Sequence, residues 1–346
     1  MRADLITRIT VCLRPFRAAG PRIEVERIGD KRVVHNYGHG GSGWSLSWGS
    51  STIARDKAMA GGTREVAVIG CGALGLTSAL LLQRAGARVT IYASERLSDT
   101  RSARATGSWS PDSRIADAAR VSPDFPALWE QMARTSYAAH QTYVGQVGEP
   151  VSWRDLYLLR DKDEVERPDP PNAIDFIRLD DRLRDLVPRS HALTPDQHPF
   201  PVDEARRGTS MTFNVAELAH RLTTDFLLEG GHIETMTFHS PTDLSRLSQP
   251  VVVNCTGYGA RALWNDQTIT PVRGQIAWLP PQPEVRYSLS YRGVGVVPRP
   301  DGIVVQSYGD SEMFGYGIDH ETPDRAEAEA AIATIAPLFA RARNLP

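Results

Sequence analysis

The amino-acid sequence predicts an α/β fold. The clearest sign is a stretch that alternates: residues 66–69 are apolar, a glycine turn follows, 76–84 has a helical pattern, and 88–92 is rich in β-branched residues. Further strands are expected at 232–238, 251–253, 294–297 and 303–306, and further helices at 215–228 and 325–340. Strands mixed with helices in this way favour layers of helix and sheet over an all-α or all-β protein.

The composition is that of an ordinary globular protein. Of the 346 residues, 41% are hydrophobic and 23% are charged, and the net charge is −2. Because 39 basic residues are balanced by 41 acidic ones, no basic face is expected, and nucleic acid is not an expected partner. The longest apolar runs fall short of the roughly 18 residues that a membrane span needs, so we expect no membrane.

The three cysteines point to the cellular compartment. Cys12, Cys71 and Cys255 are too few and too scattered for a disulfide framework, which favours a reducing, cytoplasmic environment. Residues 5–13 are apolar but contain Arg8, so we expect a strand there rather than a signal peptide. The nine histidines show no metal-ligand spacing, and no metal is expected.

A glycine turn carries the first functional prediction. Gly70, Gly72 and Gly75 follow the 66–69 strand in the G-x-G-x-x-G pattern. The first glycine permits a tight turn, the second allows the backbone to approach a pyrophosphate, and the third lets the helix pack on the strand. Ser94 and Glu95 stand where the pattern expects an acid for the ribose. The pattern fits FAD and NAD equally well, and a tight turn without ligand is the alternative.

A second glycine-rich segment lies earlier in the chain. Gly38, Gly40, Gly41 and Gly43 fall within six positions, between an expected strand at 33–35 and an expected helix from Trp44. So much glycine brings backbone groups close to a flat ligand, and the helix would point its positive end at it. A merely flexible loop is the alternative.

Four segments together resemble the D-amino-acid oxidase family of FAD flavoenzymes. They are His-Asn-Tyr-Gly-His-Gly-Gly-x-Gly at 35–43, Asn-Cys-Thr-Gly at 254–257, Pro-Val-Arg-Gly-Gln-Ile at 271–276 and Cys-Leu-Arg-Pro-Phe-Arg at 12–17. In the family, the segments that resemble 12–17 and 35–43 come last, whereas here they precede the Gly70 turn. The resemblance therefore implies a circular permutation, in which residues 1–58 are the family's usual C-terminal portion and residues 1 and 346 lie close together.

The resemblance also assigns roles to residues. It implies that Arg14 binds the substrate carboxylate, that the Tyr291 hydroxyl supports it, and that the Gly41 carbonyl accepts a hydrogen bond from the substrate amine. The implied FAD contacts are Gly40, Ser42, Gly43, Trp44, Ser45, Gly70, Gly72, Ala73, Leu74, Gly75, Ser94, Glu95, Thr100, Arg101, Ser102, Thr106, Gly107, Ser108, Cys255, Thr256 and Gly257.

Three positions depart from the family pattern. The second active-site tyrosine falls on Gly295, the acid after the second strand falls on Ser94 with Glu95 one place later, and an expected tryptophan falls on Gly259. A pocket without the second tyrosine ring is expected to be larger or to be filled from elsewhere.

The implied activity is oxidative deamination of D-amino acids. A hydride passes from the substrate Cα to flavin N5, the imino acid hydrolyses to a keto acid and ammonia, and oxygen reoxidises the flavin to give hydrogen peroxide. The alternatives are a glycine- or sarcosine-type amine oxidase, a dehydrogenase with another acceptor, or a non-catalytic FAD-binding protein. An NAD-dependent dehydrogenase leaves the 33–45 segment without a role. The partners implied are a small amino acid or amine and molecular oxygen, and the oligomeric state is left open.

The resemblance implies two interleaved domains. A Rossmann-like FAD-binding domain is expected from 30–110 and 205–268. A substrate domain with a mixed or antiparallel sheet is expected from 1–29, 111–204 and 269–346. The active site is expected between them.

Overall fold

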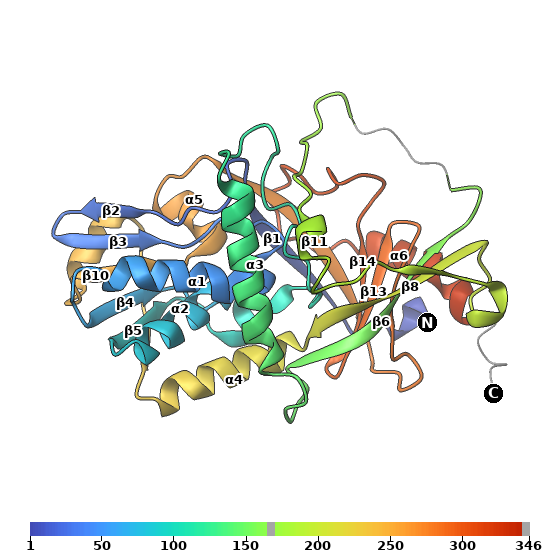
Figure 1. Ribbon diagram of the computed structural model, residues 1–346, viewed down its shortest axis with the longest axis horizontal. Helices are drawn as coiled ribbons and strands as arrows, with labels where there is room; N and C mark the ends of the chain where they lie inside the picture. Colours follow the sequence, from blue (N-terminus) through green and yellow to red (C-terminus); the bar gives the residue numbers. More distant parts are fainter. Residues whose placement is uncertain (165–169, 341–346) are drawn as a thin grey trace.

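Residues 1–164 and 170–340, which the computed structural model describes, form two β-sheets with helices packed against them (Figure 1). The first sheet has six strands in the order β2-β3-β10-β4-β5-β9. β2 runs antiparallel to β3, and the other five strands are parallel to one another. The strands are β2 (Val25–Ile28), β3 (Lys31–His35), β4 (Glu65–Ile69), β5 (Arg88–Ala93), β9 (His232–Thr235) and β10 (Val251–Asn254).

Helices cover one face of this sheet. α1 (Gly43–Met59), α2 (Ala73–Arg84) and α4 (Val215–Leu228) share one apolar cluster with β4, β5 and β10, and α3 (Phe125–Gln141) crosses over α1 (Figure 1). α1 and α3 approach closely at Gly49, where an added Cβ would lie 2.1 Å from the Met132 carbonyl oxygen. The central strands β4 and β10 are buried along almost their whole length, because a second apolar cluster that contains Leu244 and Leu247 covers the other face of the sheet.

The second sheet has eight strands in the order β1-β11-β14-β13-β12-β6-β8-β7. β6 and β12 pair in parallel, and the other neighbours pair antiparallel, so the sheet is mixed as expected. α6 (Arg325–Ala340) packs on β14. The strands are β1 (Arg8–Arg17), β6 (Val151–Arg160), β7 (His191–Leu193), β8 (Glu204–Phe213), β11 (Ile269–Leu279), β12 (Ser288–Tyr291), β13 (Val294–Arg299) and β14 (Gly302–Ser307).

Several boundaries differ from the sequence predictions. The strand expected at 5–13 begins at Arg8, because residues 3–5 form a short 3-10 helix, η1. The strand expected at 232–238 ends at Thr235. β2 belongs to the six-stranded sheet, since it forms a hairpin with β3, and β8 belongs to the eight-stranded sheet, since it pairs with β6. The sequence placed domain boundaries at 29 and 205. In the structure, the chain passes from one sheet to the other about five residues before the first boundary and about nine residues after the second.

The N-terminal segment packs against the last described helix. η1 contacts α6, and Met1, Ala3 and Ile6 pack on the apolar cluster that contains Ile335 and Leu338. Residue 346 lies outside the described residues, so the expected closeness of residues 1 and 346, and with it the permutation, stays a prediction. The described part of the chain holds no helix that is long and apolar enough to cross a bilayer.

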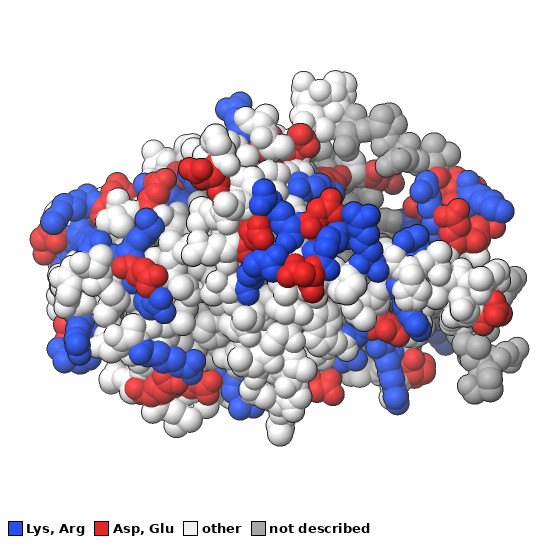
Figure 2. Space-filling model, viewed as in Figure 1, with Lys and Arg blue, Asp and Glu red and all other residues white. Residues whose placement is uncertain are grey.

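The face shown in Figure 2 carries both signs of charge, interspersed over its surface. Elsewhere on the chain, Arg134 pairs with Glu130 and Asp185, and Arg182 pairs with Glu130. These side chains are at least partly exposed, so each pair contributes little to stability.

Candidate active site

A cleft of about 760 Å³ lies between the two sheets. On one side it is lined by the carboxyl ends of β4, β5 and β10, and on the other by β1, β11 and β14. Ligands of open α/β sheets bind beyond the carboxyl ends of the strands, so this cleft is where the sequence placed a cofactor. The volume is within the range of about 300–1,000 Å³ typical of small-molecule and cofactor sites.

The glycine turn forms one wall of the cleft. Gly70, with φ of +103°, makes the turn, and Gly70, Gly72, Ala73 and Leu74 all line the cleft. Gly75 does not line it. A Cβ there would lie 2.0 Å from the Gly70 carbonyl oxygen, so Gly75 lets α2 pack on β4, as the pattern predicts for a third glycine. α2 has no acidic residue in its first turn, and its N-cap, Gly72, supplies no side-chain cap.

Two further segments continue this wall. Ser94 and Glu95 line the cleft at the end of β5, and both are exposed. Cys255, Thr256 and Gly257 line it after β10. All five lie where the sequence placed cofactor contacts.

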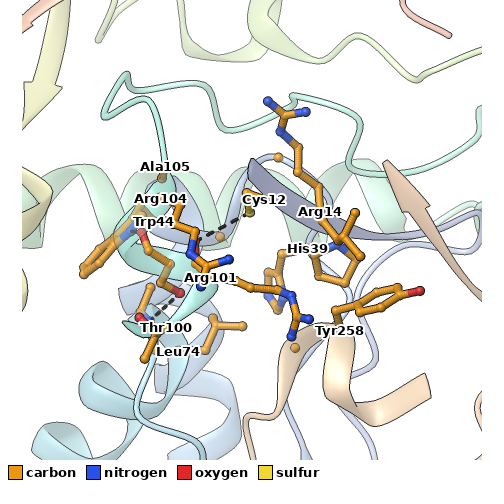
Figure 3. Close-up of a pocket in the computed structure, with 18 of the residues that line it drawn as sticks. Cys12, Arg14, His39, Trp44, Leu74, Thr100, Arg101, Arg104, Ala105 and Tyr258 are labelled. Atoms are coloured by element: carbon orange, nitrogen blue, oxygen red, sulfur yellow. Dashed lines mark hydrogen bonds between the residues drawn. The ribbon is translucent and has the colours of Figure 1, made fainter. Parts of the chain in front are cut away.

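The segment at 100–108 crosses the cleft beside α2. The six residues predicted here, Thr100, Arg101, Ser102, Thr106, Gly107 and Ser108, all line it. The Ala73 amide donates to Ser102 Oγ at 3.1 Å, and Trp44 Nε1 donates to the Ser102 carbonyl at 2.9 Å. Arg101 lies 5.3 Å from the ring centroid of Tyr258 and donates two hydrogen bonds to Glu321 (Figure 3). These bonds tie the segment to the first turns of α1 and α2 and to the loop that precedes α6.

The glycine-rich loop at 38–43 is held by a buried hydrogen-bond network. Ser50 Oγ donates to Asn36 Oδ1 at 2.5 Å, which leaves the hydroxyl oxygen to accept from His39 Nε2 at 2.7 Å. Asn36 Nδ2 donates to Ser51 and Ser78. Burial lowers the pKa of His39 to about 3, so the ring is neutral at physiological pH. These bonds hold the loop in one conformation, which argues against a merely flexible segment.

The N-terminus of α1 follows this loop into the cleft. Gly40, Gly41, Gly43, Trp44 and Ser45 line the cleft. Ser42 does not. Its side chain is buried, and its hydroxyl donates to the Ser113 carbonyl at 3.2 Å instead of capping the helix.

These features fit FAD. Two helix N-termini, those of α1 and α2, open into one cleft without a cap from their own N-cap side chains and without acidic residues in their first turns. Such termini bind anionic groups, so the N-terminus of α2 would hold a pyrophosphate and that of α1 would face the electron-rich edge of a flavin. A Cβ on Gly43 would have no protein atom within 4 Å, so the space beside α1 is open to a ligand.

Arg14 lies at the other end of the cleft. Its side chain extends from β1 away from Thr100 and Leu74 (Figure 3). The guanidinium lies flat against Gly274 of the neighbouring strand β11, where a Cβ would be 2.3 Å from its nitrogens. Arg14 donates a long hydrogen bond of 3.4 Å to the Arg273 carbonyl, and no carboxylate of the described residues forms an ion pair with it. Its charge is therefore available to a ligand.

The position of Tyr291 does not agree with its predicted role. Tyr291 is not among the cleft-lining residues, and its hydroxyl donates to Asp161 Oδ2 at 2.6 Å. The tyrosine that lines the cleft is instead Tyr308, which follows the hairpin of β13 and β14.

Tyr308 occupies the space that the sequence left open. It follows β14 and lines the cleft, and its hydroxyl lies over Gly295, where a Cβ would be 2.2 Å away. Glycine within a strand is a sign of close approach by a neighbour. Gly295 was therefore the one signal that could have located this tyrosine.

Arg114 is a second residue that sequence reasoning missed. It lines the cleft from the loop that runs beside Gly40 and Gly41, and the Gly41 amide donates to the Ser113 carbonyl at 2.9 Å. Arg114 has a φ of +47°, which is unusual for a residue with a side chain, and no pattern in the sequence marks it.

Comparison with known proteins identifies the family. A family model described as FAD dependent oxidoreductase matches residues 65–345. The chain belongs to this family. FAD is thus the cofactor of its family, and the predicted FAD-dependent oxidoreductase is confirmed at that level. Residues 1–64, which supply β1, the glycine-rich loop and the start of α1 to the cleft, lie outside the match.

Individual members of the family are similar over different lengths. The D-amino-acid oxidase of Streptomyces coelicolor is 32% identical over 61% of this chain and 58% of its own length. The D-amino-acid oxidase of Dictyostelium discoideum is 25% identical over 80% of this chain and 74% of its own length. The chain thus matches about three fifths of the first relative. Glycine oxidase from Geobacillus kaustophilus has a similar fold, with a TM-score of 0.51 at 15% identity over 82% of this chain and 78% of its own.

Proposed function

We propose that this protein oxidises D-amino acids, with FAD as the bound acceptor and molecular oxygen as the final one. The overall reaction converts the amino acid, oxygen and water into a 2-oxo acid, ammonia and hydrogen peroxide. When bound, FAD supplies the two-electron acceptor that the oxidation of a C–H bond requires. The chain's own residues bind and orient the substrate.

Arg14 carries the proposal. An arginine fork binds a carboxylate through two parallel hydrogen bonds, and Gly274 keeps this fork flat against β11. In this position the fork faces the same cleft as the N-terminus of α1, so an amino acid bound to it lies beside the proposed flavin site.

Tyr308 takes the role that the sequence gave to Tyr291. Burial raises the pKa of Tyr308, so its hydroxyl stays protonated and donates a hydrogen bond to the carboxylate held by Arg14. The Gly41 carbonyl, in the loop beside α1, is the proposed acceptor for the substrate amine. Contacts at both ends of the amino acid orient its Cα, and orientation is the main source of catalysis here.

The preference for D-amino acids rests on the names of the two D-amino-acid oxidases that the chain is similar to. A glycine- or sarcosine-type oxidase is the second candidate, and it uses a related fold. Tyr308 over Gly295 argues against the enlarged pocket that first suggested it. A cytoplasmic location stays a prediction.

The test is a measurement of oxygen uptake by the FAD-loaded protein. Oxygen consumption with D-alanine, matched by equal amounts of hydrogen peroxide and ammonia, and absent with L-alanine, is the expected result. Uptake with glycine or sarcosine alone would favour the second candidate. A flavin that is reduced by D-alanine without oxygen uptake would indicate a dehydrogenase. No reduction by any amine would indicate a non-catalytic flavoprotein.

A further inference from the structure

The end of the cleft that contains Arg14, here called the substrate end, holds two arginines. An amino acid without an acidic side chain has only one carboxylate. Arg14 and Arg114 line this end together with Tyr308. They come from different parts of the chain, Arg14 from β1 and Arg114 from the loop that precedes α3. Under the proposed function, the Arg14 guanidinium binds the α-carboxylate of the substrate. That function gives the Arg114 guanidinium no ligand.

The Arg114 side chain is fixed by its surroundings. Its Nε donates to the Glu312 carbonyl oxygen at 2.8 Å, and its guanidinium carbon lies 5.9 Å from the ring centroid of Phe176. The adjacent backbone is clamped against the glycine loop, since a Cβ on Gly40 would lie 1.9 Å from the Arg114 carbonyl oxygen. Arg114 is thus built into the wall and is not a mobile surface side chain.

The charge of Arg114 is only partly compensated. No carboxylate of the described residues is within ion-pair distance of it. The Glu312 carboxylate forms its ion pair with Arg178 and acts on Arg114 only at longer range, where its negative charge favours the charged guanidinium. Burial and then the positive charge of Arg14 lower the pKa of Arg114 to about 10, which still leaves it charged at physiological pH. A half-buried pair of like charges is unfavourable until an anion joins it.

We propose that Arg114 binds a second carboxylate, so that the preferred substrates are acidic D-amino acids, the aspartate and glutamate class. This proposal rests on the proposed function and names the substrate class of that same site. A dicarboxylic amino acid neutralises both guanidiniums, whereas its amide analogue has the same shape but leaves Arg114 unpaired. Arg114 would therefore recognise the negative charge of the side chain. A comparison of the acid with its amide isolates the contribution of this charge, because the two have the same shape.

The test compares D-aspartate with D-asparagine as substrates of the FAD-loaded protein. We expect kcat/KM to favour D-aspartate by at least tenfold, and Arg114→Gln to bring this ratio to about one. Arg114→Lys, which keeps the charge without the fork, is expected to retain part of the preference. Arg120→Gln is the matched control, because Arg120 is exposed on the same loop and does not line the cleft. It is expected to keep the preference.

Calorimetric binding gives a readout that does not depend on turnover. Succinate, with two carboxylates, is expected to bind the FAD-loaded protein at least tenfold more tightly than butyrate, and Arg114→Gln is expected to remove this difference. Equal kcat/KM for acid and amide in the unaltered protein, or a preference that survives Arg114→Gln, would overturn the proposal. If D-alanine and D-aspartate both fail to reduce the flavin while succinate still binds through Arg114, the proposed function fails and the dicarboxylate site stands.

Discussion

The two ends of the cleft are built in different ways. The end proposed to hold the cofactor, here called the cofactor end, is made of backbone: a glycine turn, a glycine loop and the N-termini of α1 and α2. The substrate end is made of side chains, chiefly Arg14, Arg114 and Tyr308, which converge from β1, a loop and the residue after β14. A cofactor site can thus be marked by a glycine spacing that is visible in the sequence. The residues that would select the substrate are scattered along the chain and follow no such spacing.

The largest expected effect is that of replacing Arg14, and it should change substrate turnover but not flavin binding. Arg14→Met removes the group proposed to bind the α-carboxylate, and we expect kcat/KM for D-alanine to fall about 1,000-fold, or about 4 kcal/mol. The flavin should remain bound, because Arg14 lies away from the glycine turn (Figure 3). Steady-state kinetics together with the flavin-to-protein absorbance ratio measure both. A loss of flavin in this variant would show that the two ends are not separable.

Buried histidines make the cofactor end sensitive to acid. Burial lowers the pKa of His39 to about 3 and that of His140, which donates to the Trp44 carbonyl at the start of α1, to about 4. Both values lie below the value of about 6.5 in the unfolded chain. The unfolded state therefore binds more protons below pH 6.5, and the free energy of unfolding should decrease as the pH falls toward these values.

Urea unfolding at a series of pH values measures this loss. Between pH 7 and pH 5 we expect the two histidines to reduce the free energy of unfolding by about 3 kcal/mol. In His140→Gln, which keeps a hydrogen-bond donor, about half of the pH dependence should disappear. A pH dependence identical to that of the unaltered protein would contradict the assignment.

Gly43→Val tests the cofactor end directly. Because a Cβ at Gly43 meets no protein atom within 4 Å, the protein without FAD should keep its thermal midpoint. The added methyl groups should crowd the flavin and weaken FAD binding about 30-fold, or about 2 kcal/mol. Equilibrium titration of the apoprotein with FAD measures the change, and Gly43→Ala should show a smaller one. Unchanged affinity in both variants would place the flavin elsewhere.

Gly274→Ala tests whether the position of the Arg14 guanidinium matters for substrate binding. The new Cβ would meet the far end of the Arg14 side chain, which is flexible, so the fold should be kept while the guanidinium is displaced. We expect KM for D-alanine to rise about tenfold, which corresponds to about 1.4 kcal/mol, with little change in thermal stability. If KM is unaffected, Arg14 does not bind substrate in the position seen here.

The smallest expected effect concerns chain order. A chain in which residues 59–346 come first and residues 1–58 follow through a flexible linker should fold, bind FAD and lose no more than about 1 kcal/mol of stability, because η1 already packs on α6. A matched control that instead begins at Ser51, within α1, should fail to bind FAD, since it breaks a buried helix. Failure of the first chain would contradict the proposed permutation.

Most of the residues that the sequence assigned to the cofactor line the cleft, because the signal that marks them is local. A positive φ favours glycine at Gly70, and the close approach of other atoms favours it at Gly72 and Gly75. These three positions lie within six residues of the chain, so their spacing is visible in the sequence. The helix expected at 215–228 coincides with α4 because its apolar periodicity is strong, and the helix expected at 325–340 coincides with α6 because the segment is rich in alanine.

The substrate end could not be predicted in the same way. Tyr308 faces the cleft because Gly295 lies on the adjacent strand, and such pairings become visible only when the register of β13 and β14 is known. Arg114 depends on a left-handed backbone residue in a loop, which periodicity does not reveal. Tyr291 was chosen from the family resemblance, which does not fix where a side chain points.

The central claim is that this cleft holds FAD beside a D-amino acid bound to Arg14. The most direct test is the visible absorbance of the FAD-loaded protein after anaerobic addition of D-alanine or D-aspartate and, separately, of their L-enantiomers, because this first step does not depend on the final acceptor. The account predicts that at least one of the D-amino acids bleaches the flavin band and that its L-enantiomer leaves it unchanged. A flavin band that none of these amino acids bleaches, or that both enantiomers bleach equally, would contradict it.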